Sequence, residues 1–322
     1  MNNPIDFVIA AAFTITTAIF IIITLGISLP VNIMTYGQQL PNDTNYNNNN
    51  SSSKIVILTF GDTYKSQFTT AKPILDKYGF KASIFITCTY ANDQNKTRHM
   101  SWSDILALQD DGQDIESKGM TPVDLNNVSS KALNFETAGS KECLESHGII
   151  NSPNIFAAKY GNVWNNKTVI DAISKYYGFA DNGIASLMFL HCDGYKKKEF
   201  PSQTDCRTYN DNGELTYANR YSIREWSHNS HDKIYQHNDQ IIFQKFVEEV
   251  ISGIAFNNEK GMVDAIPIVA YHSIDDNKNP FSTDVSLFAA EMKYLYDNGF
   301  KVIPMSDLRY DKRTNYMYMK RL

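Results

Sequence analysis

From Lys54 onward, short runs of β-branched and aromatic residues alternate with longer stretches that carry apolar residues at helical spacing. This alternation is typical of strands that are each followed by a helix packed on the outer face of a sheet. The apolar content of 43% in 322 residues is enough for one large core. The rhythm therefore predicts a single α/β domain.

The expected elements follow from this rhythm. Strands are predicted at 54–60, 82–88, 153–158, 265–272 and 301–305, and a short one is predicted from Asp114. Helices are predicted at 67–78, 129–147, 166–177, 241–254 and 284–298, and after Ser101, a capping residue. Between 189 and 239 no period is sustained, and the stretch is too long for an ordinary connection. We interpret it as an insertion.

The N-terminal region predicts a membrane anchor. After a short segment at 1–6 without Lys or Arg, residues 7–31 contain no charge and are long enough to cross a hydrocarbon core of about 30 Å. A cleaved signal peptide is the alternative, but it would have a shorter apolar region after a basic segment. Residues 32–53 are Asn- and Ser-rich and cannot bury enough apolar surface to fold, which predicts a disordered tether. The folded domain is expected at 54–310, with a C-terminal tail at 311–322.

Several features predict that the main domain is extracellular or on the cell surface. Acceptor triplets of the form N-x-Ser/Thr are compatible with a glycoprotein and occur at Asn42, Asn49, Asn50, Asn95, Asn127 and Asn166. The formal net charge is only -5, and Lys and Arg are not clustered. Nucleic acid is therefore not expected as a partner. The membrane is expected as a partner through the apolar segment at 7–31.

The four cysteines form no CxxC pair, which argues against a zinc ribbon or a thioredoxin-like motif. In an exported domain they could form two disulfides. Cys192 and Cys206 both lie in the expected insertion and could close it, which would leave Cys88 and Cys143 for a second bridge. Four cysteines allow three connectivities, and the sequence does not choose among them.

Four segments, in their order along 54–308, resemble the NodB-homology domain of the polysaccharide deacetylases, carbohydrate esterase family 4. They are VILTFGDT with PILDKYGFKASIF, DIESKGMTPVDL, FAAKYGNVWNN, and IPIVAYHSI with FAAEMKYLYDNGFKVIPMSDL. The resemblance implies a distorted (β/α) barrel whose active site lies at the carboxyl ends of the strands. It implies N-acetylated polysaccharide or cell-envelope glycan as the partner. In that family a divalent cation held by one Asp and two His polarises the acetamide, a second Asp is the base, and a late-strand His is the acid.

Position by position, this chain lacks most of these residues. The family's T-F-D-D-G is TFGDT here, so Gly61 stands at the base position while Asp62 keeps the metal-ligand position. The family's S-H-G-M-T-H is SKGMTP, so Lys118 and Pro122 replace both histidine ligands. His272 keeps the position of the acid. A core histidine and a strand-end carboxylate bonded to backbone are the alternative roles of His272 and Asp62.

The R-x-P-Y-G motif appears as AAKYG, without its Arg and Pro. Lys159, Tyr160 and the nearby Trp164 are candidates for the substrate groove, because a flat ring can contact the apolar face of a pyranose. The alternative is that the aromatic residues pack over the barrel mouth.

A single carboxylate does not hold zinc, because such sites use three or four protein ligands. We therefore expect no metal at the ancestral position, and we hypothesise that Lys118 pairs with Asp62 in place of the cation. The predicted function is that of a membrane-anchored, extracellular, deacetylase-like protein that acts on or binds N-acetylated glycans, with metal-dependent deacetylation lost or altered.

Two other functions are considered. The first is an active carbohydrate N-deacetylase that uses zinc or another divalent metal held by replacement ligands. Candidate ligands are His272 and a set in the insertion that comprises His191, Asp193, His228 and His231. Ordinary loop and core histidines explain that set more simply. The second is a structural envelope protein without a ligand.

Overall fold

The structure is a computed structural model. It describes residues 54–93, 97–150, 153–163, 166–184, 187–190, 220–228, 238–256, 265–277, 279–311 and 316–320. All of these residues belong to one compact unit that spans Asp43–Leu322. The predicted anchor, the tether, Trp164, Cys192 and Cys206 lie outside the described residues.

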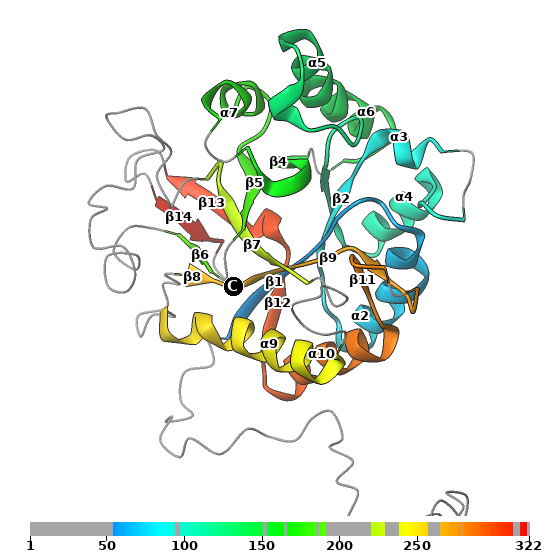
Figure 1. Cartoon of the computed structure of the whole chain (residues 1–322), viewed down its shortest axis with the longest axis vertical. Coiled ribbons are helices and arrows are strands. Elements are labelled where there is room, and N and C mark those ends of the chain that lie inside the picture. The colour runs from blue at the N-terminus through cyan, green and yellow to red at the C-terminus, as the bar shows by residue number, and fades with distance from the viewer. Residues whose placement is uncertain are drawn as a thin grey trace, which may run out of the picture. The chain divides into compact units, whose positions relative to one another are not determined.

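Seven parallel strands of the described chain close into a barrel (Figure 1). In spatial order they are β1 (Ile55–Phe60), β2 (Ser83–Ile86), β3 (Asp114–Ser117), β4 (Ile155–Ala157), β5 (Phe179–Ile184), β7 (Ile223–Ser227) and β9 (Ile268–Tyr271). The ring closes where β9 pairs with β1, with Ile57 opposite Ile268 and Phe60 opposite Tyr271. On its other side, β1 pairs first with β12 (Lys301–Ile303) and then with β2. All the carboxyl ends therefore meet at one end of the barrel, as the resemblance implies.

Helices surround the strands in Figure 1. They are α2 (Lys72–Tyr78), α3 (Cys88–Ala91), α4 (Trp102–Asp110), α5 (Ser130–Asn134), α6 (Ser140–Ser146), α7 (Lys167–Ile173), α9 (Asp239–Ser252) and α10 (Val285–Asp297). Ser101 caps α4 in a reciprocal capping box with Asp104, and Gly79, with φ 69°, ends α2. The helix expected at 129–147 runs from α5 to α6 through a π-helical turn at Phe135–Gly139.

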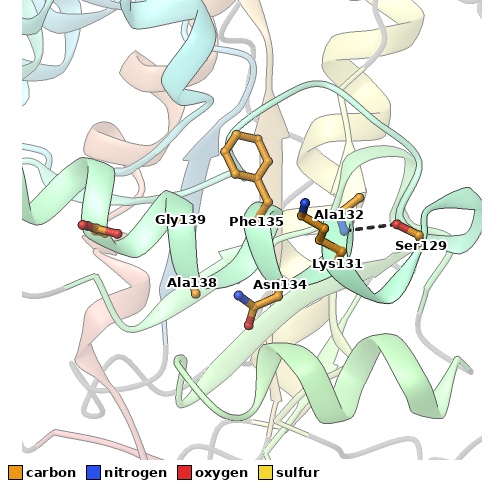
Figure 2. A pocket seen from close by; sticks show the side chains of 8 residues that line it. Ser129, Lys131, Ala132, Asn134, Phe135, Ala138 and Gly139 are labelled. Atoms are coloured by element: carbon orange, nitrogen blue, oxygen red, sulfur yellow. Dashed lines mark hydrogen bonds between the residues drawn. The ribbon is translucent and has the colours of Figure 1, made fainter.

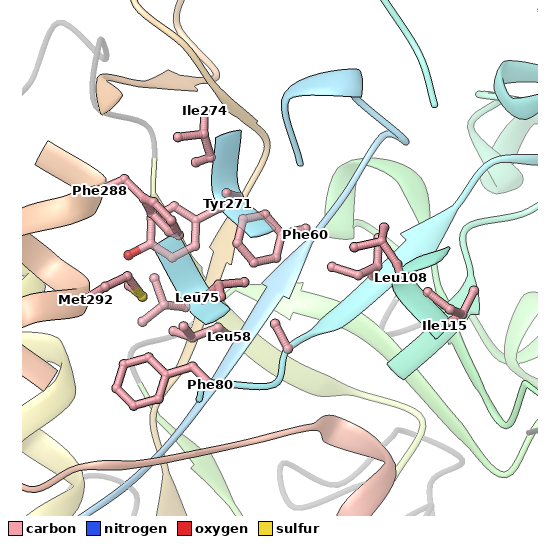
Figure 3. Close-up of a cluster of buried hydrophobic side chains, with 14 of the residues drawn as sticks. Leu58, Phe60, Leu75, Phe80, Leu108, Ile115, Tyr271, Ile274, Phe288 and Met292 are labelled. Atoms are coloured by element: carbon pink, nitrogen blue, oxygen red, sulfur yellow. The ribbon is translucent and has the colours of Figure 1, made fainter. Parts of the chain in front are cut away.

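Alternating side chains of β1 build two cores. Val56, Leu58 and Phe60 face the helices, whereas Ile55 and Ile57 face the barrel interior. Figure 3 shows the outer core, in which Phe60 stacks on Tyr271 at a ring-centre distance of 5.5 Å. Leu75 from α2 and Met292 from α10 pack into the same cluster. Burying each such side chain contributes about 1.5–3 kcal/mol, so this layer fixes the helices on the barrel.

The strands that the sequence does not predict include β5, β7 and β14. The expected insertion at 189–239 contains β7, which completes the barrel between β5 and β9. β5 has the sequence FADNGI, whose Asp, Asn and Gly disfavour strands, so no strand is predicted there. The expected tail at 311–322 contains β14 (Tyr316–Met319), which pairs in antiparallel fashion with β13 (Leu308–Asp311). β5 and β7 show no apolar period because barrel contacts, rather than their own sequence pattern, hold them in place.

A disulfide joins Cys88, the first residue of α3, to Cys143 on α6. This is one of the bridges that the sequence allows. Among the described residues, no helix has the length and apolar character needed to span a membrane. The anchor at 7–31 stays a prediction.

We predict that replacing both Cys88 and Cys143 by Ala lowers the free energy of unfolding by about 2–4 kcal/mol, because the bridge closes a long loop in the unfolded chain. Urea denaturation of the variant and the wild type measures this difference. An unchanged midpoint would show that the bridge contributes nothing to stability.

Candidate functional site

The side chains singled out by the resemblance meet at the carboxyl ends of the strands. Asp62 follows β1, Lys118 follows β3, Lys159 and Tyr160 follow β4, and His272 follows β9. All five line one cleft of about 580 Å³. Pro122 is not part of the cleft lining among the described residues. The cleft also contains residues that the sequence pattern does not predict, namely Asp181, Glu225, Ser227, Arg98 and Phe281.

His272 joins Asp62 to the end of β7. Its Nδ1 lies 2.8 Å from Oδ2 of Asp62, and its Nε2 lies 3.3 Å from Oγ of Ser227. The buried amide of Gln67 donates to the carbonyl oxygens of both Gly61 and His272, the latter at 3.0 Å. Because one side chain binds both turns, the positions of Asp62 and His272 are coupled.

The backbone is strained at the site. Among the described residues other than glycine, positive φ values occur at Asp62 (68°), Thr63 (57°) and Tyr160 (71°). Each such residue costs of order 1–3 kcal/mol and persists only where its surroundings hold it. The hydroxyl oxygen of the buried Thr63 accepts the amide of Thr87 at 2.9 Å, and its carbonyl accepts the amide of Met100 at 2.9 Å. This concentration of strain at the cleft supports its assignment as the functional site.

Lys118 lies beside Gly61 rather than on Asp62. A Cβ atom added at Gly61 would be 3.0 Å from Nζ of Lys118 and 3.7 Å from Nδ1 of His272. Within the described part of the chain, no hydrogen bond or ion pair joins Lys118 to Asp62, so Lys118 does not contact the carboxylate directly. The charge still acts at longer range. Burial alone would raise the pKa of Asp62, but the positive charge of Lys118 and the hydrogen bond from His272 outweigh it, and the pKa is lowered.

A pair of acidic side chains, Asp181 and Glu225, also lines the cleft. Asp181 on β5 is buried, and burial together with the charge and hydrogen bond of Glu225 raises its pKa well above the ordinary value. Thr59 donates to Oε2 of Glu225 at 2.8 Å. Lys118 acts in the opposite direction and favours the ionised form of Asp181. Lys118 therefore serves as the cation for both acidic centres.

These residues do not fit a divalent metal. The carboxylate of Asp62 already has His272 as its partner, an ammonium lies at one lost histidine position, and Pro122 at the other has no donor side chain. Across the described ranges, no three His, Cys, Asp or Glu side chains are placed to hold a metal.

Of the alternative metal ligands in the expected insertion, the structure describes only His228, which is not placed to bind a metal. His228 is fully buried, and its Nε2 lies 2.6 Å from Glu291 while its Nδ1 lies 3.0 Å from Oγ1 of Thr283. It is a core histidine. His191, Asp193 and His231 lie outside the described residues.

A second hollow of about 540 Å³ lies over α5 and the π-helical turn (Figure 2). Phe135 stands beside it, and Ser129, the cap of α5, lies at one end. Among the residues that the structure describes, the charged side chains that line it are Lys131 and Glu142. The hollow lacks the strand-end side chains of the barrel cleft, which we therefore take as the candidate functional site.

Solved structures share this fold. The Xyl-CE4 domain of a multidomain xylanase from the hindgut metagenome of Trinervitermes trinervoides matches with a TM-score of 0.50 and 16% identity, over 79% of this chain and 88% of that chain. The T48 deacetylase with substrate also matches with a TM-score of 0.50, with 14% identity over 80% of this chain and 90% of that chain. These likenesses show that the chain shares the barrel fold of these two proteins.

Part of the sequence matches a known family and one relative. Residues 48–179 match the family model described as polysaccharide deacetylase. The protein named "Putative polysaccharide deacetylase YxkH" from Bacillus subtilis (strain 168) is 30% identical over 94 residues, which are 29% of this chain. The chain thus spans about a third of that relative's length, 33%. Residues 48–179 are therefore similar to a polysaccharide deacetylase domain, in agreement with the resemblance of the motifs.

We predict that Asp181→Asn stabilises the protein at neutral pH. A buried acid with a raised pKa resists ionisation, so it lowers the free energy of unfolding above its ordinary pKa of 3.8. The amide removes this penalty and can still donate to Glu225. The gain should shrink as the pH falls toward 3.8, where the unfolded carboxyl is protonated as well.

Urea denaturation at several pH values measures the effect. The exposed Asp297, which pairs with Lys293 on α10, provides the control variant Asp297→Asn, for which no gain is expected. A gain for Asp181→Asn that did not change with pH would contradict this account.

Proposed function

We propose that this chain is a membrane-anchored, cell-surface member of the polysaccharide deacetylase family that binds N-acetylated glycan and has lost metal-dependent deacetylation. The observation that carries the proposal is the ammonium of Lys118 beside Gly61, at the place where the family positions a metal and a base. A fixed positive charge there opposes the binding of a second cation. The same charge leaves the cleft able to attract polar and anionic groups.

The lining of the cleft supports glycan binding. Tyr160 and Phe281 expose 62% and 51% of their surfaces, and both line the cleft. Exposed rings suit the apolar faces of sugar rings, and the polar side chains of Lys159, Arg98 and Asn279 in the same cleft suit hydroxyl and amide groups. A purely structural envelope protein would have no use for exposed rings beside a strained, charged cleft.

The location outside the cell rests on three observations. Residues 7–31 are long and apolar enough to span a membrane, and the tether at 32–53 would separate the anchor from the barrel. The disulfide between Cys88 and Cys143 suits an oxidising compartment. We therefore propose that the barrel faces the exterior, where cell-envelope glycan is available.

We predict that Tyr160→Ala weakens binding of an N-acetylglucosamine oligomer about three- to tenfold, because a stacked ring contributes about 0.5–1.5 kcal/mol. Isothermal titration calorimetry in the presence of a chelator measures the affinity. Tyr296 on α10 is similarly exposed, at 58%, and Tyr296→Ala should bind like the wild type. Equal affinity for all three proteins would exclude Tyr160 from the binding surface.

We predict that the purified full-length protein contains no stoichiometric zinc and releases no acetate from N-acetylglucosamine oligomers. Elemental analysis and an acetate assay with and without chelator test this prediction. Stoichiometric zinc together with acetate release that the chelator abolishes would favour the active N-deacetylase and overturn the proposal.

A further inference from the structure

We infer that Ser227, His272 and Asp62 form a hydrolytic triad that cleaves short acyl esters of carbohydrates without a metal ion. The inference rests on the proposed function only for the carbohydrate part of the substrate. The three residues lie at the ends of β7, β9 and β1, which are neighbours in the barrel. The order of the strands thus places serine, histidine and aspartate side by side at one edge of the cleft.

The hydrogen-bond directions follow from the chemistry of the groups. An ionised Asp62 can only accept, so Nδ1 of His272 donates to it across 2.8 Å. In the neutral imidazole, Nε2 is then the acceptor, and the hydroxyl of Ser227 donates to it across 3.3 Å. The base thus faces the nucleophile while the carboxylate fixes its tautomer and orientation, which is the geometry that activates a serine.

The strand geometry directs Ser227 into the cleft. Glu225 and Ser227 are two residues apart on β7, so their side chains share one face, and both line the cleft. Ser227 pairs with Ala270 of β9, and the amide of His228 donates to the carbonyl of Ala270 at 2.8 Å. These backbone contacts hold Ser227 in register with the turn that carries His272.

The proposed step balances without a further reactant. Oγ of Ser227 bonds to the acyl carbon while its proton passes to Nε2 of His272. The bond between the acyl carbon and the sugar oxygen then breaks, and His272 returns the proton to that oxygen. Water, deprotonated by His272, next attacks the acyl-serine, and the serine regains its proton as the carboxylic acid leaves. The net reaction is ester plus water to alcohol plus acid.

The cleft offers positive charge for the tetrahedral intermediate. Lys118 lies beside Gly61, next to His272, and Lys159 lines the same cleft. One ammonium polarises a carbonyl less than a bound dication does, and an alcohol leaves more readily than an amine. The substrate class is therefore an O-acetyl ester rather than an N-acetyl amide.

The test uses full-length protein in chelator. Hydrolysis of 4-nitrophenyl acetate and acetate release from O-acetylated glucose report the reaction, and a fluorophosphonate probe followed by peptide mass analysis reports the activated serine. We expect the probe on Ser227. Ser227→Ala should lose labelling and reduce kcat/KM about a hundredfold or more, and His272→Ala should do the same.

Two further variants separate catalysis from structure. The double variant Ser227→Ala/His272→Ala should be no slower than either single variant, because the two residues act as a unit. Asp62 is a positioning residue, so Asp62→Asn should lower kcat with little change in KM. The control is Ser222→Ala, because Ser222 is a buried serine just before β7 whose Oγ has no hydrogen-bond partner in the described structure. It should keep both labelling and rate.

Labelling of a different serine, a Ser227→Ala variant that keeps its rate, or a wild type that is neither labelled nor active would overturn the triad. Acetate release from N-acetylglucosamine oligomers in chelator would overturn the ester class. Labelling of Ser227 in a protein that fails to bind the oligomer would uphold the triad and defeat the proposed glycan function, so the two failures are distinguishable.

Discussion

The contact between His272 and Asp62 depends on the same strands that close the barrel. β9 pairs with β1 through Phe60 and Tyr271, and the amide of Gly61 donates to the carbonyl of Tyr271 at 3.0 Å. Just beyond the ends of these two strands, Nδ1 of His272 lies 2.8 Å from Oδ2 of Asp62. Gln67 binds the carbonyl oxygens of both turns. The pairing of β9 with β1 therefore both closes the barrel and fixes the geometry of the site. A change that disrupted this pairing would separate His272 from Asp62.

The second constraint is the balance of charge in the cleft. Asp62, Asp181 and Glu225 bring three carboxyl groups to one small volume, and burial opposes the ionisation of Asp62 and Asp181. The positive charge of Lys118 acts on both acidic centres and favours their ionised forms. A lysine is a point charge on a flexible stem and cannot impose a coordination geometry. The carboxylate of Asp62 consequently has a protein partner, His272, with which it can orient an imidazole.

The sequence predicted the elements whose own pattern is strong. The continuous apolar run of β1 marks a buried strand, the apolar stripe of α10 is long enough to show helical spacing, and the capping serine marks the start of α4. β7 is five residues long and reads IREWS, with polar sequence on both sides, so no period marks it. For that reason, the sequence pattern does not predict Ser227 and Glu225 as residues of the cleft. In a strand, Ile223, Glu225 and Ser227 lie on one face, but they share no common character that would indicate a strand in this polar surrounding sequence.

By itself, the sequence determined the α/β fold class, the positions of Gly61, Asp62, Lys118 and His272 at strand ends, and the absence of histidine at positions 118 and 122, because motifs and periodicity are local properties of the chain. Only the tertiary structure decided which groups meet. It set His272 between Asp62 and Ser227, placed Lys118 beside Gly61, and joined Cys88 to Cys143. These contacts join residues far apart in sequence, and the closed ring of strands, rather than any local pattern, fixes their distances.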